Sequence, residues 1–270
     1  MRKILGAAAL AALAVPGALL LAAPAQAADN AMVSVLHGIP GVTVDVYVND
    51  KLTLDNFKPG TLAGPLSLPA GTYNIKVTDP TDATKVIIGP AAIPVKSGLN
   101  YTIVAFLGTD GKPTAKPFVN DISKIPAGQG RVTVRHVANA PAVKITADGA
   151  TLVPSLANGD EAVATVPAKT YAVAVLPAAG GAAVFSTKLP VSEGANTIVY
   201  AYGDLAGGTF AAKVQTITGM QSMPNSVPAG AAGLAGDSAA FPGWAIGLVA
   251  IGLVGAGVSA RRLVPTRSQG

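Results

Sequence analysis

The chain has no cysteine among its 270 residues. Disulfides are therefore excluded, and so is a lipid-modified N-terminus, because that modification needs a thiol. Each domain must be stabilised by its own apolar core. Aromatic residues make up 5% and charged residues 12% of the chain, and histidine occurs twice. With only two histidines, the chain offers very few side chains that could act as a general base or a soft metal ligand.

Sequence motifs of common enzyme classes are also missing. The chain contains no Gly-x-Ser-x-Gly nucleophile elbow, no His-Glu-x-x-His pair and no Gly-rich phosphate-binding loop. Asp79, Asp82 and Asp110 stand in turn-like segments without the alternating carboxylates of a calcium loop. From these absences we expect no catalytic residue, no bound metal and no cofactor.

The net charge of +5 comes from the chain ends. Five of the nineteen basic residues lie there, namely Arg2, Lys3, Arg261, Arg262 and Arg267. The segment between them carries fourteen Lys and Arg against fourteen Asp and Glu. A neutral body offers no basic patch for phosphate contacts, so we expect no nucleic-acid binding.

The N-terminus has the three parts of a secretory signal peptide. Met1-Arg2-Lys3 is basic, the run from Ile4 to Leu21 is apolar, and Ala25-Gln26-Ala27 supplies the small residues of a cleavage site. We predict cleavage after Ala27, which makes residues 1–27 a signal peptide. The alternative is an uncleaved membrane helix, and Pro16-Gly17 would break that helix.

Near the C-terminus, residues 242–260 form an uncharged apolar run that predicts one transmembrane helix. Trp244 suits a membrane interface, and Arg261 and Arg262 keep the tail, residues 261–270, in the cytoplasm. The alternative, a buried core helix, is disfavoured because the run has no polar face. We therefore expect a single-pass cell-membrane protein whose N-terminal body is extracytoplasmic.

The body between these ends contains a doubled sequence unit. Val33–Val48 reads as an apolar-x-apolar-x-His strand, a corner with proline, and a second alternating run. Val132–Ala147 repeats this pattern ninety-nine residues later. The only two histidines, His37 and His136, hold the same place in the two copies. The body is thus predicted to be two domains of one fold.

Alternation with a period of two predicts short β-strands throughout both copies. Asn49-Asp50 and Asp148-Gly149 mark equivalent hairpin turns. Pro90 and Pro94 place their strand at a sheet edge. With seven or so strands per copy and no helical period, the predicted fold class is all-β, with two tandem immunoglobulin-like β-sandwiches.

The two sandwiches are predicted to span residues 28–123 and 131–219, with a short linker over residues 124–130. Residues 220–241 are rich in Ala, Gly, Ser and Pro and predict a flexible stalk. The repeated Pro-Ala-x-Thr-Tyr predicts a corner in which the hydroxyl groups of Tyr73 and Tyr171 find backbone partners.

Four motifs of the first copy, in this order, resemble the bacterial extracytoplasmic family called domain of unknown function 4397: Val33–His37, Pro40–Val48, Leu68–Tyr73 and Tyr101–Ala105. Two tandem copies would cover about residues 31–215. The second copy departs at Lys144, which replaces Asp45, and at Lys169, which replaces Gly71. The resemblance implies a secreted or surface β-sandwich, often in tandem, with no established chemistry.

His37 and His136 are the candidate binding residues. A functional interpretation pairs His37 with Asp45 across the first hairpin as an oriented general base. The alternative is a structural histidine at a strand end, bonded to a turn carbonyl. Lys144 replaces the acid in the second copy while the histidine stays, which favours the structural alternative.

Two functions from different classes remain. The first is a membrane-anchored bacterial cell-surface protein, a non-catalytic binding, adhesion or structural module whose partner is cell-wall polymer, carbohydrate or a surface protein. The second is an extracytoplasmic hydrolase or carbohydrate-active enzyme that uses His37 or His136. We favour the first because the body is neutral, has few aromatic residues and lacks catalytic motifs.

Overall fold

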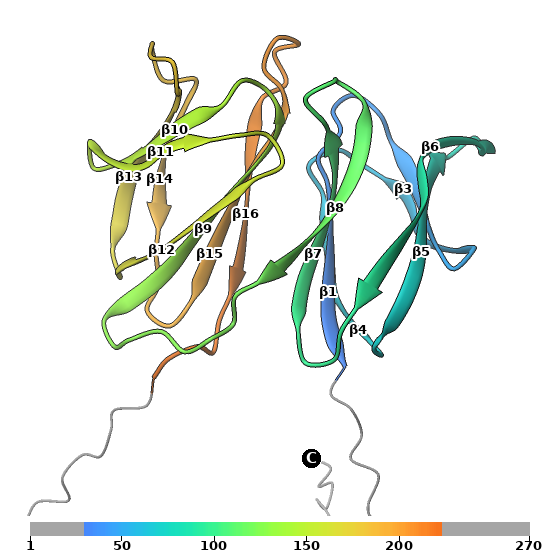
Figure 1. Cartoon of the computed structure of the whole chain (residues 1–270), viewed down its shortest axis with the longest axis horizontal. Coiled ribbons are helices and arrows are strands. Elements are labelled where there is room, and N and C mark those ends of the chain that lie inside the picture. The colour runs from blue at the N-terminus through green and yellow to red at the C-terminus, as the bar shows by residue number, and fades with distance from the viewer. Residues whose placement is uncertain (1–29, 223–270) are drawn as a thin grey trace, which may run out of the picture. The chain divides into compact units, whose positions relative to one another are not determined.

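The structure, a computed structural model, describes residues 30–222, and all sixteen of its named elements are β-strands (Figure 1). The predicted signal peptide, transmembrane span and tail, and all but the first residues of the predicted stalk, lie outside the described residues. Within residues 30–222 there is no helix that could cross a membrane. The expected all-β class is confirmed for this part of the chain.

The first eight strands form two four-stranded sheets. One sheet has the order β4-β1-β7-β8, with β1 (Ala31–His37), β4 (Leu62–Leu68), β7 (Asn100–Leu107) and β8 (Pro113–Asn120). The other has the order β3-β2-β5-β6, with β2 (Val44–Val48), β3 (Lys51–Phe57), β5 (Gly71–Asp79) and β6 (Asp82–Val95). The two sheets together make the first sandwich.

The next eight strands repeat this order strand for strand. One sheet is β12-β9-β15-β16, with β9 (Gln129–Asn139), β12 (Glu161–Pro167), β15 (Asn196–Asp204) and β16 (Ala211–Ile217). The other is β11-β10-β13-β14, with β10 (Val143–Ala147), β11 (Ala150–Leu156), β13 (Thr170–Pro177) and β14 (Phe185–Pro190). In both sandwiches the first and seventh strands pair in parallel. The doubled sequence unit is therefore a doubled fold.

The connectivity of these sandwiches differs from the immunoglobulin-like arrangement that we expected. In a constant-type immunoglobulin domain the first, second, fourth and fifth of seven strands share a sheet. Here each sandwich has eight strands, and the second strand lies in the opposite sheet from the first. Alternation identifies the buried face of a strand but not its neighbours, so the sequence pattern could not separate the two topologies.

Several local predictions are confirmed. Asn49 and Asp50 both have positive φ, 47° and 61°, as do Asp148 and Gly149, 50° and 81°, so the two hairpins have the left-handed residues of a type I′ turn. The hydroxyl groups of Tyr73 and Tyr171 donate hydrogen bonds of 2.9 Å to the carbonyl oxygens of Pro69 and Pro167. Strand β6, with its two prolines, is an edge strand.

Three apolar clusters lie inside the described residues. One fills the first sandwich and one the second. The third lies between the sandwiches and joins β4-β1-β7-β8 to β12-β9-β15-β16; its buried members are Leu36, Val104, Phe106, Phe118, Val137, Ile198 and Tyr200. A single compact unit contains all sixteen strands and all three clusters. This part of the chain thus holds a complete core of its own.

The segment between β8 and β9 also packs onto the body. Ile125, in the predicted linker, is fully buried, and its backbone N–H donates to Met220 O at 2.8 Å. The backbone N–H of Ser222 donates back to Ile125 O at 3.0 Å. Met220, with which we expected the stalk to begin, is itself 3% exposed, so the packed body reaches at least to Ser222.

The hairpin turn of the second sandwich allows a test of backbone conformation. A Cβ on Gly149 would meet nothing within 4 Å, so only its φ of 81° opposes a side chain. We expect Gly149→Ala to lower the free energy of unfolding by about 1 kcal/mol. Gly71, whose φ is outside the left-handed region and whose counterpart is Lys169, is the control: Gly71→Ala should be neutral or slightly stabilising. Urea unfolding of residues 28–222 measures the free energy of unfolding of both variants. Equal changes would show that the positive φ of Gly149 does not cause the loss of stability.

Candidate functional site

His37 lies at the end of β1 and is completely buried. Its Nε2 lies 2.8 Å from Val42 O, in the corner that leads to β2. A carbonyl oxygen only accepts, so Nε2 carries the proton and donates it. The imidazole also stacks on Phe57 with 5.7 Å between ring centroids. The ring therefore connects the corner to the sandwich core. This is the arrangement expected of a structural histidine that is bonded to a turn carbonyl.

His136 repeats this arrangement in the second sandwich. It is completely buried in β9, and its Nε2 donates to Pro141 O at 3.1 Å. In both histidines Nδ1 is buried without a hydrogen-bond partner among the described residues. Burial lowers the pKa of His37 and of His136 below the usual value. Both rings are therefore neutral and turned away from solvent in the folded protein.

The pairing of His37 with Asp45 is not the arrangement that the structure shows. Asp45 is 5% exposed, and its Oδ1 accepts a hydrogen bond of 2.8 Å from the backbone N–H of Asn56. Asn56 has a φ of 49° and lies in β3, where the register with β2 shifts. The carboxylate thus holds an irregular part of the first hairpin.

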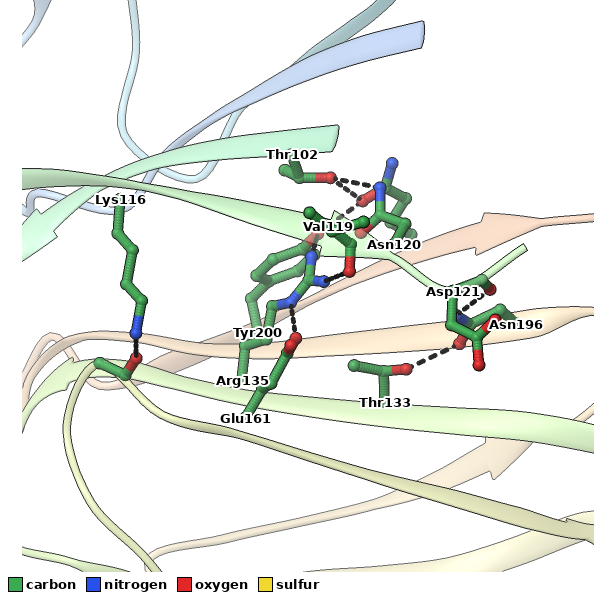
Figure 2. Close-up of polar contacts among 12 residues, drawn as sticks. Thr102, Lys116, Val119, Asn120, Asp121, Thr133, Arg135, Glu161, Asn196 and Tyr200 are labelled. Atoms are coloured by element: carbon green, nitrogen blue, oxygen red, sulfur yellow. Dashed lines mark hydrogen bonds and ion pairs between the residues drawn. The ribbon is translucent and has the colours of Figure 1, made fainter. Parts of the chain in front are cut away.

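A buried polar cluster between the two sandwiches was missed by the sequence analysis. Its centre is Arg135 of β9, whose side chain has no exposed surface. The guanidinium donates through Nε to Glu161 Oε2 at 2.8 Å and through Nη1 to Tyr200 Oη at 2.8 Å. Its Nη2 lies 3.4 Å from Val119 O, a carbonyl of the first sandwich. Figure 2 shows the guanidinium among these three partners.

Aromatic rings complete the surroundings of this cation. The guanidinium carbon lies 4.6 Å from the ring centroid of Phe118, in the first sandwich, and 5.4 Å from that of Tyr200, in the second. A weakly hydrated guanidinium over ring faces is the favourable form of such a contact. Arg135 is thus bound by an anion, a backbone carbonyl and two rings, drawn from both sandwiches.

The polar network continues across the interface through Gln215 of β16. Burial raises the pKa of Tyr200, which keeps its hydroxyl protonated, and that hydroxyl donates to Gln215 Oε1 at 2.6 Å. Thr102 of β7 donates to the same oxygen at 3.0 Å, and Gln215 Nε2 donates to Ser34 Oγ at 3.3 Å. A buried network whose members all have partners fixes one arrangement of the surfaces that it joins.

Two grooves run along the sides of this interface. The larger, of about 610 Å³, is lined from the first sandwich by Lys116, Pro117, Phe118 and Val119 and from the second by Val153, Ser155, Leu156, Asp160, Glu161 and Ala162. Lys116 Nζ donates across one end of it to Gly159 O (Figure 2). The second groove, of about 450 Å³, is lined by residues of β1, β4, β7 and β16 and by Thr218. Both exist because the sandwiches are docked.

The described residues contain no group of three or more His, Cys, Asp or Glu side chains that could hold a metal ion. The larger groove is the candidate site because it brings together a cation, two carboxylates, a hydroxyl and apolar side chains from both sandwiches. The histidines that the sequence analysis selected do not line it.

A family model described as a domain of unknown function (DUF4397) matches residues 31–146. A DUF4397 domain is therefore present where the first-copy motifs indicated one, and one copy is matched, not the two that we expected. The match covers the first sandwich and continues through β9 and most of β10 of the second.

No curated protein matches the chain. Among solved structures, one match is the crystal structure of CBMbc (family CBM26) from Eubacterium rectale Amy13K in complex with maltoheptaose. The identity is 11%, the match covers 72% of this chain and 98% of that chain, and the TM-score is 0.22. This likeness is too low to establish a common fold.

The two buried histidines predict a pH-dependent stability. Because their folded pKa values are lowered, the unfolded state binds more protons than the folded state below about pH 6.5. The free energy of unfolding should therefore fall as the pH decreases from 7 to 5, by up to about 1.4 kcal/mol per pH unit for each histidine. Urea unfolding of residues 28–222 at several pH values measures this slope.

The matched variant is His37→Gln/His136→Gln, which keeps a donor for each turn carbonyl but cannot titrate. Its unfolding free energy should depend less on pH between 7 and 5 than that of the wild type. A variant slope as steep as the wild-type slope would show that other groups cause the dependence.

The buried cation gives a second prediction. Glu161→Ala leaves the guanidinium of Arg135 without its carboxylate, and because Glu161 is one-third exposed we expect a loss of about 2 kcal/mol, below that of a fully buried pair. Lys112→Ala is the control, since it breaks an exposed pair of 3.8 Å with Asp110 and should change stability by less than about 0.5 kcal/mol. Unfolding followed by Tyr fluorescence and circular dichroism measures both, and equal losses would contradict the role of Arg135.

Proposed function

We propose that this chain is a membrane-anchored extracytoplasmic protein of the bacterial cell surface that binds its partner without catalysis, through the groove between its two docked sandwiches. The signal-peptide pattern of residues 1–27 and the apolar run of residues 242–260 support this location. The neutral body supports a partner other than nucleic acid. We further propose that the second sandwich is a DUF4397-like copy, because its strand order repeats that of the first.

The observation that carries the proposed binding role is the composition of the larger groove. Lys116 is a hydrogen-bond donor on one wall, and Ser155 and Asp160 offer a hydroxyl and a carboxylate on the other. Pro117 and Val153 add apolar surface to the lining of the groove. A groove that presents both polar groups and apolar surface suits a chain that carries hydroxyl or amide groups. We favour a cell-wall polymer, with other carbohydrates and surface proteins as alternatives.

The alternative function, a hydrolase or carbohydrate-active enzyme, depends on an accessible histidine. His37 and His136 are both completely buried, and each uses its Nε2 proton for a turn carbonyl. A general base must reach the proton that it abstracts, directly or through one water molecule. The geometry therefore favours binding over catalysis by these rings.

Binding can be tested with residues 28–222 on an array of cell-wall fractions, soluble polysaccharides and surface proteins. Ser155 is exposed in β11 and lines the groove, so Ser155→Trp places an indole in it. We expect at least a tenfold loss of affinity for the retained partner. Ser186→Trp is the matched control, because Ser186 is exposed on β14 and is not among the groove residues, and it should bind as the wild type does.

The same fractions, incubated with the protein and analysed for released fragments, test the alternative. If fragments appear, and if His37→Gln or His136→Gln abolishes them without loss of folding, the protein is an enzyme and the binding proposal is wrong. Equal affinity of the Ser155→Trp and Ser186→Trp variants would place the binding surface outside the groove.

A further inference from the structure

The second sandwich contains an apolar cavity between its two sheets, which shares no lining residue with the larger groove. Its volume is about 150 Å³. Apart from the hydroxyl of Thr187, every side chain that lines it is apolar; the lining includes Val134, Val173, Val199 and Phe210. A dry cavity of this size with aliphatic and aromatic walls can hold a benzene-sized molecule. A cavity of about 40 Å³ in the first sandwich shares equivalent positions of the first, second, fifth and seventh strands but extends toward β4 and has no lining residue from β8.

Equivalent positions in the two sandwiches differ in side-chain size. The alignment follows from the shared place of His37 and His136 and from the strand registers. Ile103 and Ile75, which line the small cavity, correspond to Val199 and Val173, which line the large one. Leu107, packed against the first core, corresponds to Gly203. Val199 and Val173 each have one carbon atom fewer than their counterparts, whereas Ile145 and Leu152 are larger than theirs, Val46 and Thr53. Backbone of Thr209 occupies the place of a side chain at Gly203.

The cavity opens at one edge of the sandwich. Of its lining residues, Thr187 of β14 and Val214 of β16 are exposed, and Phe185 and Phe210 of the same edges are half-buried. Strands β14 and β16 are the edge strands of the two sheets (Figure 1). In the first sandwich the equivalent strands β6 and β8 contact each other. The edge between β14 and β16 is therefore an entrance to the cavity, and the equivalent edge of the first sandwich, between β6 and β8, is closed.

We propose that the second sandwich binds an uncharged apolar group of about six carbon atoms, which enters between β14 and β16 and lies against Val173 and Val199. The cavity is smaller than an ordinary drug-sized pocket, so the ligand inserts a single ring or a short stretch of hydrocarbon. A small free molecule and the end of a lipid acyl chain share this chemistry. The first sandwich, with the same fold and a filled core, does not bind it.

Methyl NMR spectra of residues 28–222, which hold the complete core, test the proposal. Benzene represents the free molecule and dodecanoate the acyl chain. Saturable shifts of the methyl signals of Val134, Val173, Val175 and Val199 are expected, without saturable shifts of Val35 and Ile103 in the first sandwich. Binding of benzene alone identifies a small-molecule site, and competing binding of both probes identifies a site that also admits chains.

Two variants fill the cavity. Val173→Ile/Val199→Ile installs the residues of the first sandwich, and Ala212→Leu fills the cavity from β16. Either should weaken probe binding at least tenfold and raise the thermal midpoint. Val163→Ile is the control, because Val163 is 52% exposed and does not line the cavity. No saturable shift with either probe, or shifts that persist unchanged in both filled variants, would overturn the proposal.

Discussion

The burial of one guanidinium, that of Arg135, is the constraint on which the arrangement of the two sandwiches depends. A cation without exposed surface must recover its lost hydration from nearby groups, and an unpaired one would be very costly. In the second sandwich, Glu161 and Tyr200 replace part of the lost hydration. In the first sandwich, Val119 O and the ring of Phe118 provide the remaining contacts. If the sandwiches separated, water would hydrate the guanidinium again, so the groups of the first sandwich offset the desolvation of the cation on docking and specify the geometry of the docked state.

Apolar packing makes that docked state stable, and the polar groups make it specific. The buried members of the interface cluster come from both sandwiches, and each such side chain contributes about 1.5–3 kcal/mol when it leaves water. Apolar surfaces alone could slide on one another. Gln215, which joins Tyr200 to Thr102 and Ser34, allows one register, because a slipped interface would leave these groups buried without partners. The shape of the grooves beside the interface therefore depends on this register.

The sequence predicted what depends on neighbouring residues and missed what depends on distant ones. The hairpin turns at Asn49 and Asp148 and the corner at Tyr73 follow from local chemistry, and all three are present. The pairing of strands does not follow from local chemistry, and the immunoglobulin-like connectivity that we expected was wrong. The interface was also overlooked, although its signal exists: Thr102 and Val104 alternate with core residues in a nearly continuous apolar run, which indicates a strand buried on both faces.

The same division explains why the sequence draws attention to the histidines and not to the groove. Rarity made His37 and His136 prominent, but their burial shows that each closes a corner. The residues of the groove are ordinary ones, Lys116 and Asp160 among them, and they become neighbours only when two domains dock. No spacing along the chain could have brought them together, because they belong to different sandwiches.

Docking also accounts for the cavity between the sheets of the second sandwich. A cavity of about 150 Å³ lowers the free energy of unfolding by roughly 3–4 kcal/mol, which is a large share of the net stability of a small domain. The second sandwich tolerates this loss because Ile198 and Tyr200, on the outer face of β15, are completely buried against the first sandwich. The burial of two such side chains offsets a cost of this size. The first sandwich thus stabilises its neighbour enough for that neighbour to keep an open space between its sheets.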